Sequence, residues 1–402
     1  MKIVFLMHSV DKVGGITRAT LTMASQLVDR GHTVQIAAMF RESERPGFDI
    51  DPRIDVVWLL ESAEHSAMMS SEHWHTMSTT RSTVYPEGDA FRASSYSLLT
   101  DKLLRDYLHT CAADVILATS PGLNVCLAKY APADAIVIGQ EHLFHHHHIP
   151  ALADKLLAAA ARLDALVTVT EADAHVYRQK LGRYAHRVHF IPNPIPAPHP
   201  GLRECKERTI VAAGRLTEAK NFRMLIDAFA TLHRHEPAWR LEIYGTGEEE
   251  EALGAQIRRL GLTNSAFLMG NLTPMDAAWA RASIAAVSSN NESFGLTIVE
   301  AMRYGLPVVS TACQHGPPEI VSHGVDGFLT PVKDTDAFAE ALLTLACEDT
   351  RRMEMSRAAV RKARRYEPDR IAAEYERLFR YLSERKRPTR TVHSRKVPTL
   401  QA

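Results

Sequence analysis

The amino-acid sequence predicts an α/β protein with two successive doubly wound parallel sheets. Apolar strand-like runs alternate with segments of helical periodicity, a proline-rich connector divides the chain near its middle, and the same alternation restarts after the connector. The 402 residues are too many for one hydrophobic core and sufficient for two.

The N-terminal half begins with a strand–helix–strand unit. Lys2–Met7 is a continuous apolar run, typical of a parallel strand that is buried on both faces. Gly14-Gly15 ends the run, apolar residues then recur at helical spacing, and Gly31 stands where a helix C-cap is expected. The next strands are expected at Val34–Met39, Val56–Leu60, Asp114–Thr119, Ala135–Ile138, Ala165–Val169 and Val188–Ile191.

The segment Glu61–Ser95 interrupts this alternation. It is rich in Ser, His, Met and Thr and contains Pro86-Glu87-Gly88. We expect a long loop or a pair of irregular segments, and loops of this length are usually functional or mobile. His73 and His75 are expected to belong to this loop.

The segment Ile191–Gly201, with five prolines, predicts a stiff extended connector between domains 1–195 and 202–367. A helix at 368–383 is expected to pack back on the first domain, and 384–402 is expected to be a basic, flexible tail. The second domain is expected to contain strands Thr209–Ala213, Arg240–Tyr244, Ala266–Met269, Ile284–Ser288 and Pro307–Val309, and helices Asn221–His233, Glu249–Leu260, Pro274–Arg281, Leu296–Tyr304, Asp334–Cys347 and Thr350–Arg365.

Composition restricts the class of protein. The net charge is zero, which argues against steering of the whole protein toward nucleic acid. No run approaches the roughly 20 apolar residues that span a bilayer, and the five scattered cysteines indicate reduced thiols. We therefore expect a cytoplasmic protein. Arg385-Lys386-Arg387 leaves a peripheral association with anionic lipid or polymer at the inner face of the membrane open.

Gly14-Gly15 is the first candidate ligand-binding element, because it lies between a strand and a helix. Glycines there allow close approach of a ligand, and the helix N-terminus favours an anion. A plain tight turn would have the same sequence, and the dinucleotide pattern G-x-G-x-x-G is absent.

Arg215 and Lys220 form the second candidate. They follow the strand Thr209–Ala213 at the position where doubly wound sheets bind ligands. A guanidinium fork and a mobile ammonium suit a pyrophosphate, whereas a solvated surface pair is the alternative.

Glu292 and Glu300 form the third. Glu292 lies in a loop after strand Ile284–Ser288, and Glu300 lies in the next helix, where a carboxylate could accept hydrogen bonds from ribose hydroxyls. Two carboxylates could also suggest a glycosidase pair. That alternative is disfavoured because both residues lie on one loop–helix element.

The spacing Glu292-x7-Glu300 with an embedded Ser-Phe-Gly resembles the signature of retaining glycosyltransferase family 4, whose members have the GT-B fold of two Rossmann-like domains facing across a cleft. The resemblance extends from Lys2 to about Leu382. The opening Val13–Arg18 also resembles glycosyltransferases that act on wall polymers of the teichoic-acid type. Further segments in family order are Gly14-Gly15, Gly214-Arg215 with Lys220, Tyr244–Gly247, Gly305–Val309, Gly316–Val321 and Gly324 with Gly327.

The resemblance implies a role for each matched residue. Arg215 and Lys220 would neutralise the leaving pyrophosphate, Glu292 would lie beside the donor sugar, and Glu300 would hold the ribose. His142, in Gly139-Gln140-Glu141-His142, would face the donor sugar. The other implied donor contacts are Gly14, Gly15, Gly245, Phe294, Gly295 and Leu296.

Two departures from the family pattern leave the sugar undetermined. The usual Asn-Gly before the connector is Asn193-Pro194, and the usual Gly-Gly-Pro is His315-Gly316-Pro317. No metal site is expected. Asp49-Ile50-Asp51 has the spelling of a metal-binding D-x-D but lies in a polar loop, and His145–His148 suggests acceptor-side surface, an acceptor contact or an adventitious metal.

The resulting functional prediction is a retaining, metal-independent glycosyltransferase with no cofactor. It would move a sugar from a nucleoside-diphosphate donor, UDP-linked rather than GDP-linked, to a hydroxyl of a glycan, lipid-linked or wall-polymer acceptor. Transfer would occur on the same face of the sugar, with a donor phosphate oxygen taking the proton, rather than by double displacement. The alternatives are a sugar-nucleotide epimerase or hydrolase and a non-catalytic nucleotide-sugar-binding protein. Oligomeric state is left open.

Overall fold

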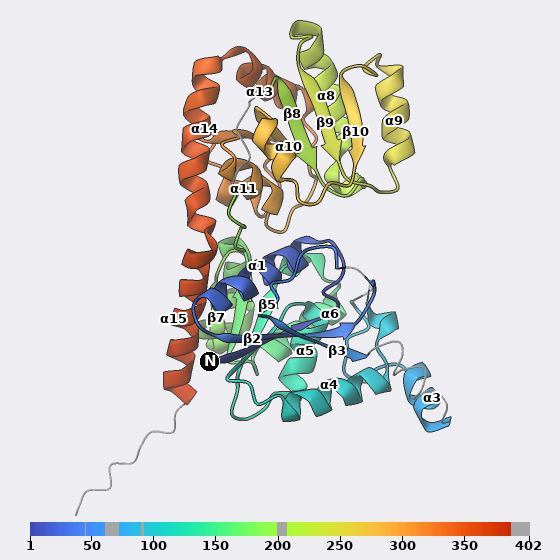
Figure 1. Ribbon diagram of the computed structural model, residues 1–402, viewed down its shortest axis with the longest axis vertical. Coiled ribbons are helices and arrows are strands. Elements are labelled where there is room, and N and C mark those ends of the chain that lie inside the picture. Colours follow the sequence, from blue (N-terminus) through green and yellow to red (C-terminus); the bar gives the residue numbers. More distant parts are fainter. Residues whose placement is uncertain (45, 61–71, 90–91, 199–206, 387–402) are drawn as a thin grey trace, which may run out of the picture.

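The computed structural model describes residues 1–44, 46–60, 72–89, 92–198 and 207–386. Two lobes each contain one sheet, and every strand pairing between named strands is parallel (Figure 1). The N-terminal sheet has the order β3-β2-β1-β4-β5-β6-β7, and the C-terminal sheet has the order β10-β9-β8-β11-β12-β13. The predicted doubly wound α/β class is confirmed.

The N-terminal lobe carries the longer sheet. Its strands are β1 (Lys2–Met7), β2 (Thr33–Phe40), β3 (Asp55–Leu60), β4 (Val115–Ala118), β5 (Ile136–Glu141), β6 (Ala165–Thr168) and β7 (Val188–Phe190). Its helices are α1 (Gly15–Asp29), α3 (Glu72–Thr79), α4 (Leu98–Thr110), α5 (Pro121–Tyr130), α6 (Pro150–Ala160) and α7 (Glu171–Leu181). Because the helices cover both faces, strands such as β1 and β4 are almost fully buried.

The C-terminal lobe repeats this plan. Its strands are β8 (Thr209–Ala213), β9 (Arg240–Tyr244), β10 (Ala266–Gly270), β11 (Ile284–Val287), β12 (Val308–Thr311) and β13 (Gly327–Thr330). Its helices are α8 (Phe222–His235), α9 (Glu250–Arg259), α10 (Asp276–Arg281), α11 (Leu296–Arg303), α12 (Pro317–Ile320), α13 (Thr335–Cys347) and α14 (Asp349–Ala363).

Three segments differ from the sequence prediction. β5 continues three residues beyond Ile138, because Gly139–Glu141 pair with β6, and the four-residue strand β13 was missed. The expected loop Glu61–Ser95 contains the helix α3, which packs against α4 and carries His73 and His75. Residues 61–71 and 90–91 of that segment lie outside the described residues.

Helix α15 (Pro368–Lys386) leaves the C-terminal lobe and runs along the N-terminal lobe (Figure 1). Its apolar face, including Tyr375 and Phe379, belongs to the same buried cluster as Phe5 of β1. The helix is three residues longer than predicted, and residues 387–402 of the expected basic tail lie outside the described residues.

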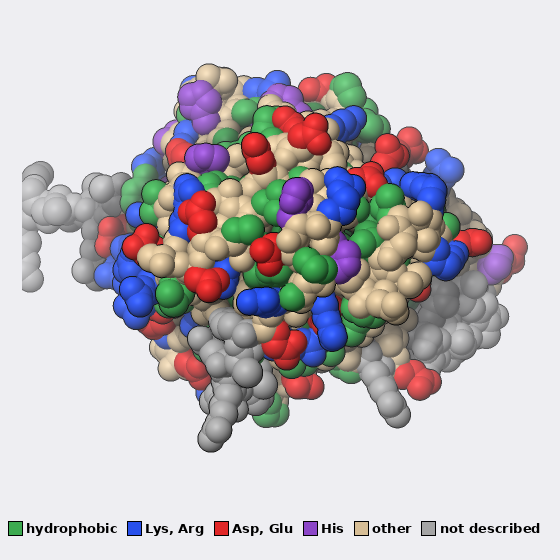
Figure 2. Space-filling model, turned by 90° about the horizontal axis from the view of Figure 1, so that it is seen from above, with side chains coloured by type: hydrophobic (Ala, Val, Ile, Leu, Met, Phe, Trp, Pro, Cys, Tyr) green, Lys and Arg blue, Asp and Glu red, His purple; other side chains and the backbone are tan. Residues whose placement is uncertain are grey.

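Two further features concern the charges on the surface and the character of the helices. Acidic and basic side chains are interspersed over the face shown in Figure 2, consistent with the zero net charge. Within the described part of the chain, none of the helices combines the length and the apolar character that a membrane crossing requires.

Because Phe379 of α15 is buried, replacing it with a smaller residue should strongly destabilise the protein. Phe379→Ala should lower the free energy of unfolding by about 3–5 kcal/mol, because a ring that is 1% exposed leaves a cavity. The measurement is urea denaturation followed by circular dichroism. Tyr381→Ala, on the same helix but 41% exposed, should cost about 1 kcal/mol or less. Equal costs for the two variants would contradict this packing.

Candidate functional site

A cavity of about 380 Å³ lies between the two lobes, at the carboxyl ends of their strands. The N-terminal lobe contributes Val13, Gly14, Gly15, Arg18 and Phe48. The C-terminal lobe contributes its two glycine-containing loops, Leu272 to Met275 in part, and the start of α11. Of the residues singled out from the sequence, the cavity brings together Gly14, Gly15, Arg215, Gly245, Leu296 and Glu300.

The N-terminus of α1 forms one wall. Gly14 is its N-cap in an extended conformation, and nothing lies within 4 Å of where a Cβ would stand. A Cβ on Gly15, in contrast, would lie 2.7 Å from Cδ1 of Leu296 in the other lobe. Any larger residue at position 15 would force the Leu296 side chain to shift, so glycine permits the close approach of α1 to α11 seen here.

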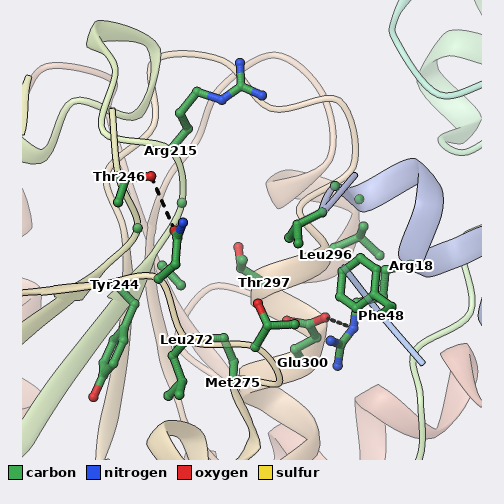
Figure 3. A pocket seen from close by; sticks show the side chains of 18 residues that line it. Arg18, Phe48, Arg215, Tyr244, Thr246, Leu272, Met275, Leu296, Thr297 and Glu300 are labelled. Atoms are coloured by element: carbon green, nitrogen blue, oxygen red, sulfur yellow. Dashed lines mark hydrogen bonds and ion pairs between the residues drawn. The ribbon is translucent and has the colours of Figure 1, made fainter. Parts of the chain in front are cut away.

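The opposite wall is built from the loops after β8 and β9. Gly245 has a φ of +141°, and a Cβ there would lie 1.9 Å from the carbonyl oxygen of Gly214. Only glycine allows these two loops to touch. Arg215 lines the cavity but is exposed, and Figure 3 shows its guanidinium directed away from Glu300.

Glu300 lies at the other end of the cavity, inside α11, whose N-cap Gly295 has a left-handed φ of +99°. Its carboxylate forms an ion pair with Arg18 of α1, with Nε 2.9 Å from Oε1 (Figure 3). Burial raises the pKa of Glu300, the Arg18 guanidinium opposes that change, and Asp276 of α10 adds to it. Arg18 was missed in the sequence, although a cation in the first turn of a helix was a signal that it needs a partner.

Lys220 and Glu292 form a second group outside the lining of that cavity. Lys220 Nζ lies 2.5 Å from Glu292 Oε1, and the Ser289 hydroxyl donates to the same oxygen at 2.7 Å. Burial and the nearby Glu292 raise the pKa of the Cys313 thiol to about 11. The predicted cation and the predicted catalytic carboxylate thus neutralise one another in this structure.

His142 directly follows β5 and is buried. Neither of its ring nitrogens has a hydrogen-bond partner among the described residues. Burial, with the charge of Arg92, lowers the pKa of His142 to about 4, so the ring is neutral at physiological pH. Both ring nitrogens are shielded from solvent, and His142 is not part of the cavity lining.

Two further contacts join the lobes. The ring of Phe144 stacks on His315 of the C-terminal lobe, with centroids 4.6 Å apart. The carboxylate of Glu319 accepts hydrogen bonds from the backbone N–H groups of Glu171 and Ala172 at the start of α7, at 2.8 and 3.1 Å. Negative charge at a helix N-terminus is stabilising, so this contact favours a closed cleft.

The other residues singled out from the sequence make contacts with neighbouring residues of the protein. The ring of the buried Phe294 packs edge-on against Tyr366. His148 pairs with the buried Glu141 at 3.2 Å, and Asp51 accepts from Arg53 and Ser25. No three His, Cys, Asp or Glu side chains in the described part of the chain are arranged to hold a metal ion.

Two family models match the chain. One, described as Glycosyltransferase Family 4, matches residues 13–197, and the other, described as Glycosyl transferases group 1, matches residues 207–348. An exopolysaccharide phosphotransferase of Streptomyces coelicolor is 32% identical over 98% of this chain. The chain spans 42% of that relative, less than half its length.

Solved structures show the same fold. TarM superimposes with a TM-score of 0.76 and 15% identity over 94% of this chain and 98% of TarM. Anabaena HepE, solved in complex with UDP and glucose, gives a TM-score of 0.72 and 20% identity over 95% of this chain and all of HepE. Both contain the two-lobed GT-B arrangement found here.

The environment of His142 predicts an imidazole that does not titrate near neutrality. With a pKa of about 4, its NMR signals should stay in place between about pH 5.5 and 8, whereas an exposed histidine changes near pH 6.5. The signals are identified by their loss in His142→Gln. A midpoint near pH 6.5 for those signals would contradict the buried, neutral ring.

Proposed function

The chain belongs to glycosyltransferase family 4, and on that premise we propose that it moves a sugar from a UDP-sugar to an acceptor hydroxyl with retention of anomeric configuration. The observation that carries the proposal is the cavity between the lobes. It combines glycine loops, an arginine and a buried carboxylate at the facing carboxyl ends of two parallel sheets.

The nucleoside would bind at the end of the cavity that holds Glu300. A buried carboxylate there can accept hydrogen bonds from two ribose hydroxyls, and Leu272 and Met275 supply apolar surface beside it. UDP rather than GDP is supported by the similar fold of HepE, which was solved with UDP.

The diphosphate would lie between the two lobes. Arg215 and Lys220, with the N-termini of α1 and α11, would supply positive charge on either side of it. Lys220 pairs with Glu292 in this structure, so the ammonium is already fixed near the reacting end. Fixed cations stabilise the charge that develops on a leaving diphosphate without rearranging during the reaction.

Transfer would take place beside Glu292 and His142. The bond from the anomeric carbon to the phosphate oxygen breaks, the acceptor oxygen bonds to the same face of that carbon, and a donor phosphate oxygen takes the acceptor proton. Neutral His142 would contact a sugar hydroxyl, and the Glu292 carboxylate would lie near the positive charge that spreads over the ring. The products are the glycosylated acceptor and the nucleoside diphosphate.

The acceptor would be a hydroxyl of a glycan or cell-surface polymer. The similarity to an exopolysaccharide phosphotransferase supports this class, and so does the fold shared with TarM. The proposal concerns the transferase step alone, because the chain spans only part of that relative.

Removing Lys220 tests the transfer site. Lys220→Ala should lower kcat by about 10²–10³-fold, the usual effect of losing one fixed stabilising group, while the protein stays folded. Sugar transfer is measured by UDP release with and without acceptor, and folding by circular dichroism. Arg223→Ala removes an ion pair between Arg223 of α8 and Glu249, the N-cap of α9, and should leave transfer unchanged. A fully active Lys220→Ala would contradict the site.

Thermal unfolding with nucleotides tests the donor class. UDP at 100 times its dissociation constant should stabilise the protein by about 2.7 kcal/mol, and Glu300→Ala should lose most of that gain. Stabilisation by GDP but not by UDP would overturn the choice of donor. Release of free sugar with no dependence on any acceptor would indicate a hydrolase instead of a transferase.

A further inference from the structure

Helices α1 and α11 contact one another across the cleft at two points. The second contact lies one helical turn beyond the first on both helices. Gly15 meets Leu296 at the start of both helices. Arg18 and Glu300, three and four residues further on, form the ion pair. Residues at these spacings share one face of a helix, so the two contacts lie on the facing sides of α1 and α11. Figure 3 shows Arg18, Leu296 and Glu300 of this group.

Arg18 stands where a helix by itself disfavours it. It lies in the first turn of α1, at the end with partial positive charge, and no acidic residue lies in that turn. Its compensation comes from the opposite lobe. Glu300 pairs with Nε at 2.9 Å, and Asp276 Oδ2 lies 3.9 Å from Nη2.

The ion pair and a ligand can use Glu300 together. An ionised carboxylate has two oxygens and about four acceptor positions. The pair to Arg18 uses Oε1, and both side chains line the cavity with 19% and 10% of their surface exposed. Arg18 also lies over the ring of Phe48, 5.6 Å from its centroid, which limits the directions that the guanidinium can take.

We propose that Arg18 is a positioning residue for the nucleoside: from the N-terminal lobe, it fixes the Glu300 carboxylate of the C-terminal lobe in the orientation that accepts the ribose hydroxyls. This rests on the proposed function, in which Glu300 binds the ribose. Donor binding then requires both lobes, although Glu300 belongs to only one.

Arg18 also affects the pKa of Glu300, and this effect predicts how nucleoside affinity should change with pH. The charged groups acting on Glu300 are Arg18 from α1, which lowers its pKa, and Asp276 from α10, which raises it in addition to burial. Without Arg18, burial and Asp276 still raise the pKa of Glu300 and only the smaller effect of Trp279 lowers it, so Glu300 takes up a proton at higher pH. A protonated carboxyl accepts fewer hydrogen bonds, so affinity for the ribose is lost as the pH falls.

The test is the dissociation constant of UDP, measured by isothermal titration calorimetry at about pH 6 and pH 8.5. Arg18→Gln should bind UDP about tenfold more weakly than the native protein at the lower pH, the change that one pKa unit represents. The difference in UDP affinity between Arg18→Gln and the native protein should be smaller at the higher pH. Arg18→Lys keeps the positive charge. The ratio of its UDP dissociation constant to that of the native protein should therefore change less with pH than the ratio for Arg18→Gln.

Arg30→Gln is the matched control, because Arg30 follows the other end of α1 and pairs with Asp369 and Glu376 of α15, away from the cavity. It should bind UDP like the native protein. Comparing each variant with the native protein at the same pH cancels the titration of UDP itself.

Three outcomes overturn the role of Arg18. They are native or tighter UDP binding by Arg18→Gln, a loss of equal size at both pH values, and an equal loss in Arg30→Gln. In each of these, binding by the native protein leaves the proposed function standing. If the native protein does not bind UDP, or if Glu300→Ala binds it normally, the proposed function fails and the role of Arg18 fails with it.

Discussion

The carboxyl ends of two parallel sheets face each other here, and the N-termini of α1 and α11 meet between them. Both helix ends carry partial positive charge, so bringing them together is unfavourable unless negative charge lies nearby. Their contact is made by an apolar side chain packed on a glycine, Leu296 on Gly15, and by the carboxylate of Glu300. The same field favours a diphosphate between the helices, which is why the donor is placed there.

The closed cleft depends on contacts that are distributed along it. Arg18–Glu300, Phe144–His315 and Glu319 at the start of α7 each join the two lobes. Helix α15 also connects the lobes, because it follows the C-terminal lobe in the chain and its apolar face packs in the core of the N-terminal lobe. Opening the cleft would therefore break several interactions while leaving both cores intact.

Charge in the site is balanced in pairs. Lys220 is paired with Glu292 and Arg18 with Glu300, while His142 is kept neutral by burial. An ion pair offsets part of the cost of burying a carboxylate, and a neutral imidazole can both donate and accept. Arg215 is an exposed cation of the cavity lining, and in the proposed reaction it would meet the released diphosphate.

The sequence by itself determined the alternation of strands and helices and six of the residues that line the cavity, because burial on both faces and glycine-containing turns are local properties. Gly245 is one of these six residues, and its positive φ value favours glycine. Only the tertiary structure decided that β5 extends to Glu141, that Glu292 pairs with Lys220, and that Arg18 meets Glu300. These depend on partners far apart in the chain, whose approach is set by how the sheets and lobes pack, and local periodicity carries no information about it.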